Sequence, residues 1–575
     1  MLPNVTHRLE LAALLPAVEG LKAALQAAQF PLDMPEAGPA RIEQRAVLAQ
    51  LDDYVVPRLN SMDAPLLAVV GGSTGAGKST LVNSLLGQAV SRSGVLRPTT
   101  RAPVLVHHPD DVRWFSGSRV LPGLARHTGG EPDADRAGPI TSLRLVPSPA
   151  LPVGLALLDA PDIDSVVSAN RQLAKQLLAA ADLWIFVTTA ARYADAVPWE
   201  LLRGAAQRGA VVAIVLDRVP PGAVDEVRPH LAQMMGERGL TSSPLFWMPE
   251  TSTDEAGLLD PAVVEPVRSW LVALAKDAAA RQAVVRRTLG GALDALRPRT
   301  LGLVSAMQAQ QESLAQLQRE VDEAYVGAVA AIEHGLSDGT LLRGEVLARW
   351  QEFAGTGELV RSIETAISRW RDRLTAAVTG RPAPVEDLEE ALQSGVEALI
   401  TDQAQGAAAQ AVRRWRSVAG GERLAGQHPD LAVPAPGLEE RVARAVRDWQ
   451  GYVLDLVRGE GGDRRATARA LSFGVNGLGV LLMLVVFSQT AGLTGAEVGI
   501  SGGTAVLAQR LLEAVFGDQA VRSLASKAKV DLLRRSAAVL AVDRARIDDV
   551  LAGLGDPGRQ AAALRAAAET VEAAR

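Results

Sequence analysis

The sequence predicts an α/β domain with a mostly parallel sheet, followed by a large all-α region. Between about residues 65 and 250, short apolar runs alternate with amphipathic helical stretches such as 170–181 and 200–208. Strands that alternate with helices indicate crossover connections and a sheet covered on both faces. After about Pro261 the strand pattern almost vanishes and helical periodicity replaces it. An uncharged segment, 470–496, lies late in this helical region.

Composition narrows the class of protein. The chain has 575 residues, 48% of them apolar and 22% charged, which is ordinary for a folded protein of several domains. Its net charge of −6 argues against bulk electrostatic binding of nucleic acid, so we expect no specific nucleic-acid partner. With no cysteine and seven scattered histidines, disulfides and zinc sites are excluded. The first twenty residues lack a signal-peptide pattern, and we expect a cytoplasmic protein.

Five regions follow from these patterns. We expect N-terminal helices over 1–60, the α/β domain over 61–275, a helical stalk over 276–463, a hydrophobic hairpin over 464–517 and returning C-terminal helices over 518–575. The N-terminal helices are expected to pack on the stalk or on the α/β domain. In the stalk, six apolar residues recur at three- and four-residue steps with Gln310 as a polar interruption: Leu303, Met307, Leu314, Leu317, Val321 and Ala324. A coiled-coil seam and an ordinary bundle helix both fit this pattern.

A phosphate-binding loop is the strongest motif in the chain. The run GGSTGAGKST at 71–80 contains G-x-x-x-x-G-K-[ST], after a predicted strand and at the start of a predicted helix. The glycines let backbone N–H groups turn toward phosphate oxygens, and the helix N-terminus adds its positive dipole. Lys78 is expected to reach the β- and γ-phosphates as a catalytic residue. The binding residues that we expect here are Gly72, Ser73, Thr74, Gly75, Ala76, Gly77, Lys78, Ser79 and Thr80.

The same motif implies a magnesium ion. The Ser79 hydroxyl is expected to ligate Mg²⁺, and Asp159, which ends the apolar run LALLD, to hold the ion through water. Between these two lies RPTTRAP, whose Thr99 or Thr100 is expected to close over the γ-phosphate and the metal. We favour Thr100, because its Thr-Arg pair precedes the strand PVLVHH. Thr100 is accordingly a predicted metal ligand and catalytic residue.

These motifs, in this order, resemble a known family. The run GxTGAGKSTLVNxLLG, then RPTT, then DAPD is similar to the translation-factor-related GTPases of the Era and dynamin superfamilies, over about 65–250. The order of leading helices, GTPase domain, helical stalk and late hydrophobic hairpin also resembles bacterial dynamin-like proteins. The resemblance implies a P-loop GTPase domain that binds GTP with Mg²⁺. It also implies pairing of GTPase domains in a homodimer or higher oligomer.

Two departures from the family pattern concern hydrolysis. Asp162 stands where the third motif usually has glycine, and an added carboxylate near phosphate is unfavourable unless it points away. Ile163 follows, where Ras-like proteins carry a water-orienting glutamine, and Thr74 stands where dynamins commonly have glutamine. We therefore expect slow intrinsic hydrolysis, or hydrolysis that needs groups from a partner.

The base-reading motif also departs from the family. The strand VVAIVL ends in Asp217-Arg218-Val219-Pro220, and Pro220 stands where a guanine-reading carboxylate belongs. Arg218 is expected to lie over the base. Asp217 either reads guanine N1–H and N2–H from three residues earlier or caps the strand, and both alternatives stay open.

The uncharged segment suggests contact with lipid. Residues 470–496 exceed the roughly 20 residues that span a bilayer, and arginines and lysines flank the wider region 470–509 on both sides. Such flanks suit a hairpin that enters and leaves on the cytoplasmic face of the membrane. We expect Asp at Leu481, Leu482 and Leu484 to abolish lipid-stimulated turnover. The alternative is a helix buried inside the all-α region.

Three functions compete at this point. The first is a dynamin-like GTPase that couples hydrolysis to membrane association through the stalk and the hairpin. The second is a soluble Era-like switch that docks a protein or ribosomal partner. The third is a nucleotide-binding scaffold with negligible turnover, suggested by Asp162, Ile163 and Pro220. We favour the first, located at the inner face of the cell membrane.

Overall fold

The computed structural model gives positions for most of the chain. It describes residues 3–91, 103–117, 119–128, 142–164, 168–207, 209–338, 383–460, 474–488 and 516–575, together with residues 341, 348, 349, 509, 512 and 513. These residues divide into two units, which are described separately. One contains residues 1–30, 35–308 and 557–575, and the other contains residues 31–34 and 309–556.

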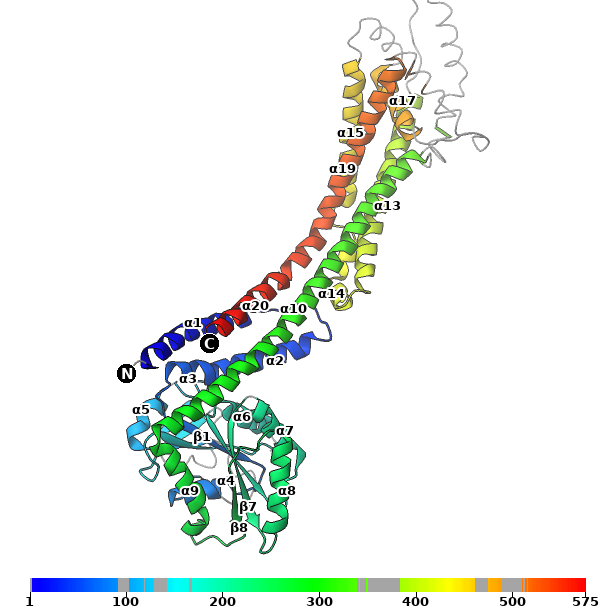
Figure 1. The fold of residues 1–575 in the computed structure, drawn as a ribbon. Helices are drawn as coiled ribbons and strands as arrows, with labels where there is room; N and C mark the ends of the chain where they lie inside the picture. Colours follow the sequence, from blue (N-terminus) through cyan, green and yellow to red (C-terminus); the bar gives the residue numbers. More distant parts are fainter. Residues whose placement is uncertain are drawn as a thin grey trace, which may run out of the picture. The chain divides into compact units, whose positions relative to one another are not determined.

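An eight-stranded sheet forms the centre of the first unit in the described residues (Figure 1). Its order is β3-β4-β2-β5-β1-β6-β7-β8, and every pairing is parallel except that of β2 with β5. The mostly parallel sheet predicted from the sequence is therefore present. The strands are β1 (Leu66–Gly72), β2 (Val104–His107), β3 (Ala125–Thr128), β4 (Ser142–Pro147), β5 (Leu155–Asp159), β6 (Leu183–Thr189), β7 (Val211–Val219) and β8 (Leu245–Pro249).

Helices cover both faces of this sheet. Alternate residues of β1 enter two separate cores, with Leu67 and Val69 on one face and Leu66, Ala68 and Val70 on the other. The helices α6 (Ser168–Ala179), α7 (Ala196–Gln207) and α8 (Val224–Glu237) pack on the first face, and α4 (Lys78–Leu86) and α9 (Pro261–Lys276) on the second. Two short elements, η2 (Pro109–Asp111) and α5 (Val112–Phe115), follow β2. Burial of both faces explains why the central strands are continuous apolar runs.

The N-terminal helices pack in the same unit. They are α1 (Pro3–Ala27), α2 (Ala37–Gln50), η1 (Leu51–Val55) and α3 (Val56–Asn60). Their apolar side chains share a core with the first part of α10 (Ala278–Ser337) and with α20 (Pro557–Ala573). The first and last helices of the chain therefore lie side by side, with Leu21 and Leu564 both fully buried.

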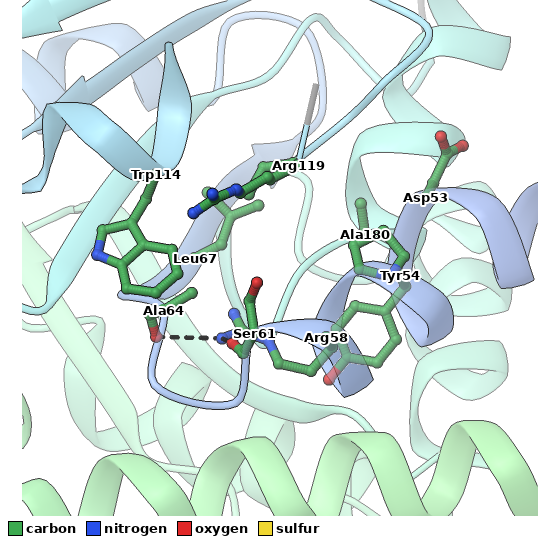
Figure 2. A pocket seen from close by; sticks show the side chains of 11 residues that line it. Asp53, Tyr54, Arg58, Ser61, Ala64, Leu67, Trp114, Arg119 and Ala180 are labelled. Carbon is green, nitrogen blue, oxygen red and sulfur yellow. Dashed lines mark hydrogen bonds between the residues drawn. The ribbon is translucent and has the colours of Figure 1, made fainter. Parts of the chain in front are cut away.

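A buried ion pair joins these helices to the sheet. Arg58 on α3 contacts the carboxylate of Asp182, which also accepts a hydrogen bond from the Leu67 N–H at 2.8 Å. The Thr288 hydroxyl on α10 donates to the Asp182 carbonyl at 2.9 Å. A shallow cleft lies beside this pair, and Figure 2 shows Trp114 and Arg119 on its wall. The cleft lies at the amino ends of β1 and β6, the sheet edge opposite the phosphate-binding loop.

The second unit is helical in its described residues. It contains the rest of α10, with α13 (Ala383–Trp415), α14 (Gly421–Gln427), η4 (Pro429–Ala432), α15 (Leu438–Glu460), α17 (Gly474–Ser488) and α19 (Asp518–Gly553). Its core is continuous from Leu314 on α10 to Leu551 on α19. The polar interruption Gln310 is buried, and its side chain is satisfied by the backbone of Leu32 through bonds of 2.8 and 3.0 Å.

The apolar segment is a buried helix where the structure describes it. α17 has 15 residues, and every described side chain from 480 to 487 is buried against neighbours that include α15 and α19. The rings of Trp449 and Phe487 lie 5.9 Å apart. Among the described residues, no helix is both long enough and apolar enough to cross a membrane. The expected hairpin is therefore seen only as this one packed helix, and residues 489–508 lie outside the described part.

Candidate nucleotide site

The phosphate-binding loop joins β1 to α4 at the carboxyl edge of the sheet. Gly75 and Gly77 have φ angles of 75° and 90°, a left-handed conformation that favours glycine. A Cβ atom built on Gly72 would overlap the carbonyl oxygen of Val187, and one on Gly77 would overlap the carboxylate of Asp217. The glycines of the motif are therefore required by the backbone and its neighbours. α4 begins at Lys78, so its N-terminus faces this loop.

Lys78 is buried at the base of the loop. Its side chain is 5% exposed, and Nζ donates a hydrogen bond to the Ser73 carbonyl at 3.0 Å. Nζ also forms an ion pair with the carboxylate of Asp162. Asp162 therefore points toward the ammonium group of Lys78. The Ser73 hydroxyl is buried and has no partner among the described residues.

Ser79 and Asp159 lie in contact at the end of β5. The Ser79 hydroxyl donates to Oδ2 of Asp159 at 2.6 Å, and the Ser91 hydroxyl donates to the same oxygen. The second oxygen, Oδ1, is buried without a partner in the described chain. Burial raises the pKa of Asp159, while the hydrogen bonds from the two serines oppose that shift. A buried carboxylate oxygen without a donor is suited to a cation or to a water bound to one.

A further carboxylate, that of Asp164, is hydrogen-bonded to the loop. Oδ1 of Asp164 accepts hydrogen bonds from the Thr74 N–H at 2.6 Å and from the Thr74 hydroxyl at 2.7 Å. Its Oδ2 pairs with Arg192 at 2.9 Å, and Arg192 also donates to the Thr74 carbonyl at 3.0 Å. Burial alone would raise the pKa of Asp164, but the hydrogen bonds from Thr74 and Arg192 together lower it. Asp164 and Arg192 therefore both form hydrogen bonds with Thr74 of the phosphate-binding loop.

Asp217 and Arg218 lie at the far end of β7. The Asp217 side chain is 9% exposed, accepts a hydrogen bond from the Arg218 N–H at 2.8 Å and lies against Gly77. Burial raises the pKa of Asp217, and the hydrogen bond from Arg218 opposes the shift. Arg218 has a φ of 51° and a largely exposed side chain. The base-reading roles expected for these two residues stay predictions.

The structure brings most of the predicted residues to one edge. Lys78, Ser79, Asp159 and Asp217 gather where β1, β5 and β7 end, as expected for parallel strands. Thr99 and Thr100 lie outside the described residues, so the metal and catalytic roles of Thr100 stay predictions. Sequence reasoning missed Arg192, Ser91 and the contact of Asp164 with Thr74. The position of Arg192 just after β6 was the available signal, because that loop opens at the same edge.

The comparisons with known proteins concern the domain that carries this site. The sequence profile of the dynamin family matches residues 67–216, from β1 into β7. A relative from Arabidopsis thaliana, "Probable transmembrane GTPase FZO-like, chloroplastic", is 25% identical over 151 residues. The match covers 26% of this chain and 15% of that relative, well under two thirds of its length. Residues 67–216 are therefore similar to the dynamin-family domain, and the relative matched over 151 residues is itself named a GTPase.

Solved structures give weaker likenesses. An oligomerised bacterial dynamin pair, described for long-range sensing and tethering of membranes, is 11% identical with a TM-score of 0.43, over 93% of this chain and 94% of that one. Toc33 from Arabidopsis thaliana, in complex with Mg²⁺ and GMPPNP, is 15% identical with a TM-score of 0.23, over 44% of this chain and 96% of that one. At such scores neither likeness establishes a shared fold. The Era-like half of the resemblance gains no support from these comparisons.

Proposed function

We propose that this chain is a dynamin-like GTPase that binds GTP with Mg²⁺ at the carboxyl edge of its sheet and couples hydrolysis to membrane association. The carrying observation is the convergence of Lys78, Ser79 and Asp159 around a phosphate-binding loop. Lys78 and the loop N–H groups supply positive charge for the phosphates. Intrinsic hydrolysis is slow in this proposal, because the two positions where related GTPases carry a glutamine hold Thr74 and Ile163.

Magnesium fits the residues present. Ser79 would ligate the ion directly, and Asp159 would hold it through water by its unpartnered Oδ1. No group of three or more His, Asp or Glu side chains suited to a metal occurs among the described residues. When bound, Mg²⁺ neutralises charge on the phosphates. Thr100 remains proposed as a further ligand.

The membrane part of the proposal rests on α17 and its neighbours in sequence. The uncharged stretch is long, but its described part is packed inside the helical unit, with Leu482 and Leu484 fully buried. Contact between α17 and lipid would therefore require α17 to leave its place against α15 and α19. We propose the inner face of the cell membrane as the site and paired GTPase domains as the active assembly. The Arabidopsis relative is itself named a probable transmembrane GTPase.

Burial of α17 favours a second candidate function. A helix packed on all sides needs no lipid to hide its apolar surface. In this alternative the chain is a GTPase switch whose helical unit docks a protein partner. The two candidates share the nucleotide site and differ only in what the helical unit binds.

One experiment tests the site and separates the candidates. The full chain is titrated with GTP and with ATP, and turnover is then measured with and without anionic liposomes. The first proposal expects tighter binding of GTP, slow basal turnover, and faster turnover when lipid is present. Binding of neither nucleotide would refute the site. If liposomes do not change the rate of GTP turnover and the chain does not float with them, the membrane proposal is wrong and the protein-docking switch is favoured.

A further inference from the structure

Two carboxylates from the segment that follows β5 contact groups of the loop that we expect to bind phosphate. Asp162 pairs with Lys78, and Asp164 accepts bonds from both the N–H and the hydroxyl of Thr74. Lysine ammonium and loop N–H groups are the donors that this kind of loop offers to phosphate oxygens. The segment after β5 therefore places two carboxylates on the groups that such a loop offers to phosphate. A triphosphate that takes these donors must displace both carboxylates.

Arg192 is held beside the same donors. Its NH2 group donates to Asp164 at 2.9 Å, its NH1 group to the Thr74 carbonyl at 3.0 Å and its Nε to Asp195 at 2.8 Å. Turn hydrogen bonds fix its backbone, because its N–H donates to the Thr189 carbonyl at 3.0 Å and its carbonyl accepts from the Asp195 N–H at 3.1 Å. The guanidinium is thus placed at the loop by a hydrogen-bonded turn and by two carboxylates. A planar guanidinium can donate two parallel bonds to a phosphate group as readily as to a carboxylate.

The described site offers no side chain to orient the attacking water. Thr74 and Ile163 occupy the two positions where related GTPases carry a water-orienting glutamine. The Ile163 side chain is also buried, at 2% exposure. Transition-state charge on the γ-phosphate still has to be stabilised, and a positioned arginine supplies this in other nucleotide hydrolases. Arg192 is a cation that the structure places against Thr74.

We propose that Arg192 acts in cis as the catalytic arginine of this site, with the γ-phosphate replacing Asp164 against Thr74 and against the guanidinium. This inference rests on the proposed GTPase function and adds a residue to its chemistry. Water adds to the γ-phosphorus and passes a proton to an oxygen of the γ-phosphate. The bond from that phosphorus to the β–γ bridging oxygen breaks, its electron pair stays on the oxygen of GDP, and GDP and inorganic phosphate leave. Arg192 only donates hydrogen bonds during this step and is unchanged by it.

The test compares three variants of the full chain: Arg192→Ala, Arg192→Lys and, as a matched control, Arg228→Ala on the exposed side of α8. Turnover of GTP is measured at saturating nucleotide, and affinities for GDP and for a non-hydrolysable GTP analogue are measured by calorimetry. Arg192→Ala should lower kcat by about 10³-fold, with GDP affinity kept within about twofold. Arg192→Lys should fall between, because lysine keeps the charge and loses the paired donors. Arg228→Ala should match the wild type.

Asp164→Ala tests the displacement. Removal of the carboxylate frees the Thr74 donors, so affinity for the triphosphate analogue should rise more than affinity for GDP. Equal changes for both nucleotides, or no change, would show that Asp164 does not hold the γ-phosphate position. The loss in Arg192→Ala should also be the same factor at low and high protein concentration. A loss confined to high concentration would assign the arginine to a partner copy and overturn the role in cis.

The remaining outcomes separate this inference from the proposed function. A wild-type chain that binds neither GTP nor GDP overturns both. A wild-type chain that hydrolyses GTP at the same rate with or without Arg192 overturns only the role of Arg192. If Arg192→Ala loses affinity for GDP and for the analogue equally and its kcat is unchanged, Arg192 only stabilises the loop and the catalytic role is wrong.

Discussion

The Ser79 hydroxyl donates a hydrogen bond of 2.6 Å to Oδ2 of Asp159, while Oδ1 of the same buried carboxylate has no partner among the described residues. The pair thus holds one oxygen in place and leaves the other available. This is the geometry that a water-mediated metal contact needs, because the carboxylate is oriented before the ion arrives.

The first prediction concerns the magnesium requirement. Asp159→Asn keeps the shape and removes the charge, and Ser79→Ala removes the expected direct ligand. Each change should raise the Mg²⁺ concentration for half-maximal turnover by about tenfold or more, in the range found when groups around a metal are lost. Turnover is measured against Mg²⁺ concentration, with the exposed Asp110→Asn as control. If the Mg²⁺ dependence of turnover is unchanged in both variants, Ser79 and Asp159 do not bind the metal.

The second prediction concerns Lys78. Its ammonium group pairs with Asp162 and the Ser73 carbonyl here, and we expect it to exchange Asp162 for phosphate oxygens when nucleotide binds. Charge-assisted bonds of this kind contribute roughly 1.5–3 kcal/mol, so Lys78→Ala should weaken GTP and GDP binding by about tenfold or more. Calorimetry measures both affinities, and Lys175→Ala on the exposed side of α6 is the matched control. Full affinity in Lys78→Ala would sink the assignment of the phosphate site.

The third prediction concerns base specificity. Asp217 is hydrogen-bonded to the Arg218 N–H and lies against Gly77, which favours support of the loop over reading of the base. Asp217→Ala should therefore weaken GTP and ATP binding by the same factor, about threefold to tenfold for a lost buried contact of roughly 1 kcal/mol. Competition binding with both nucleotides measures the ratio. A selective loss of GTP binding would instead make Asp217 the guanine-reading carboxylate.

The sequence was most informative where local rules act alone. The glycine-rich loop and the strands around it follow from a motif and from apolar periodicity, and they lie where they were predicted. Asp159 followed from the rule that parallel strands present their carboxyl ends together. The contacts of Arg192 and Asp164 depend on the path of two loops through space, which no periodicity encodes.

The apolar segment shows a different limit. Its length and lack of charge indicated a lipid-facing hairpin, yet the same composition serves a helix that other helices surround, as Leu482 and Phe487 show. Hydropathy reports that a side chain avoids water and does not report what replaces water. Substitution of Leu481, Leu482 and Leu484 by Asp therefore does not test contact with lipid, because all three side chains are buried. Three buried aspartates would unfold the helical unit, so loss of lipid binding would prove nothing.

The fourth prediction concerns pH and a buried carboxyl group on η1. Burial raises the pKa of Asp53, a hydrogen bond of 2.8 Å from Gln176 lowers it, and the neighbouring charge of Asp52 raises it again. The folded chain therefore keeps this proton to a higher pH than the unfolded chain, whose value is about 3.9. The contribution of Asp53 to stability should accordingly fall as the pH rises from about 4 through its raised pKa.

Asp53→Asn removes this titration and keeps an acceptor for Gln176. The variant should melt at a higher temperature than the wild type at pH 8, and the difference should shrink as the pH falls toward 4. Thermal unfolding at a series of pH values measures it, with the exposed Asp63→Asn as control. A variant that is less stable than the wild type at pH 8 would contradict the buried-carboxyl argument.

The fifth prediction tests whether α17 must leave its neighbours to reach lipid. A Cβ atom built on Gly479 lies 2.7 Å from Cδ2 of Leu454 on α15, so Gly479→Cys with Leu454→Cys brings two thiols together and removes the crowding leucine tip. The natural chain has no cysteine, so no other disulfide can form within one molecule. Oxidation should lock α17 to α15 and abolish flotation with anionic liposomes, and reduction should restore it. Each single-cysteine variant, oxidised alike, is the matched control. A cross-linked chain, verified by its mass, that floats as well as the reduced chain would show that release of α17 from α15 is not how this protein binds a membrane.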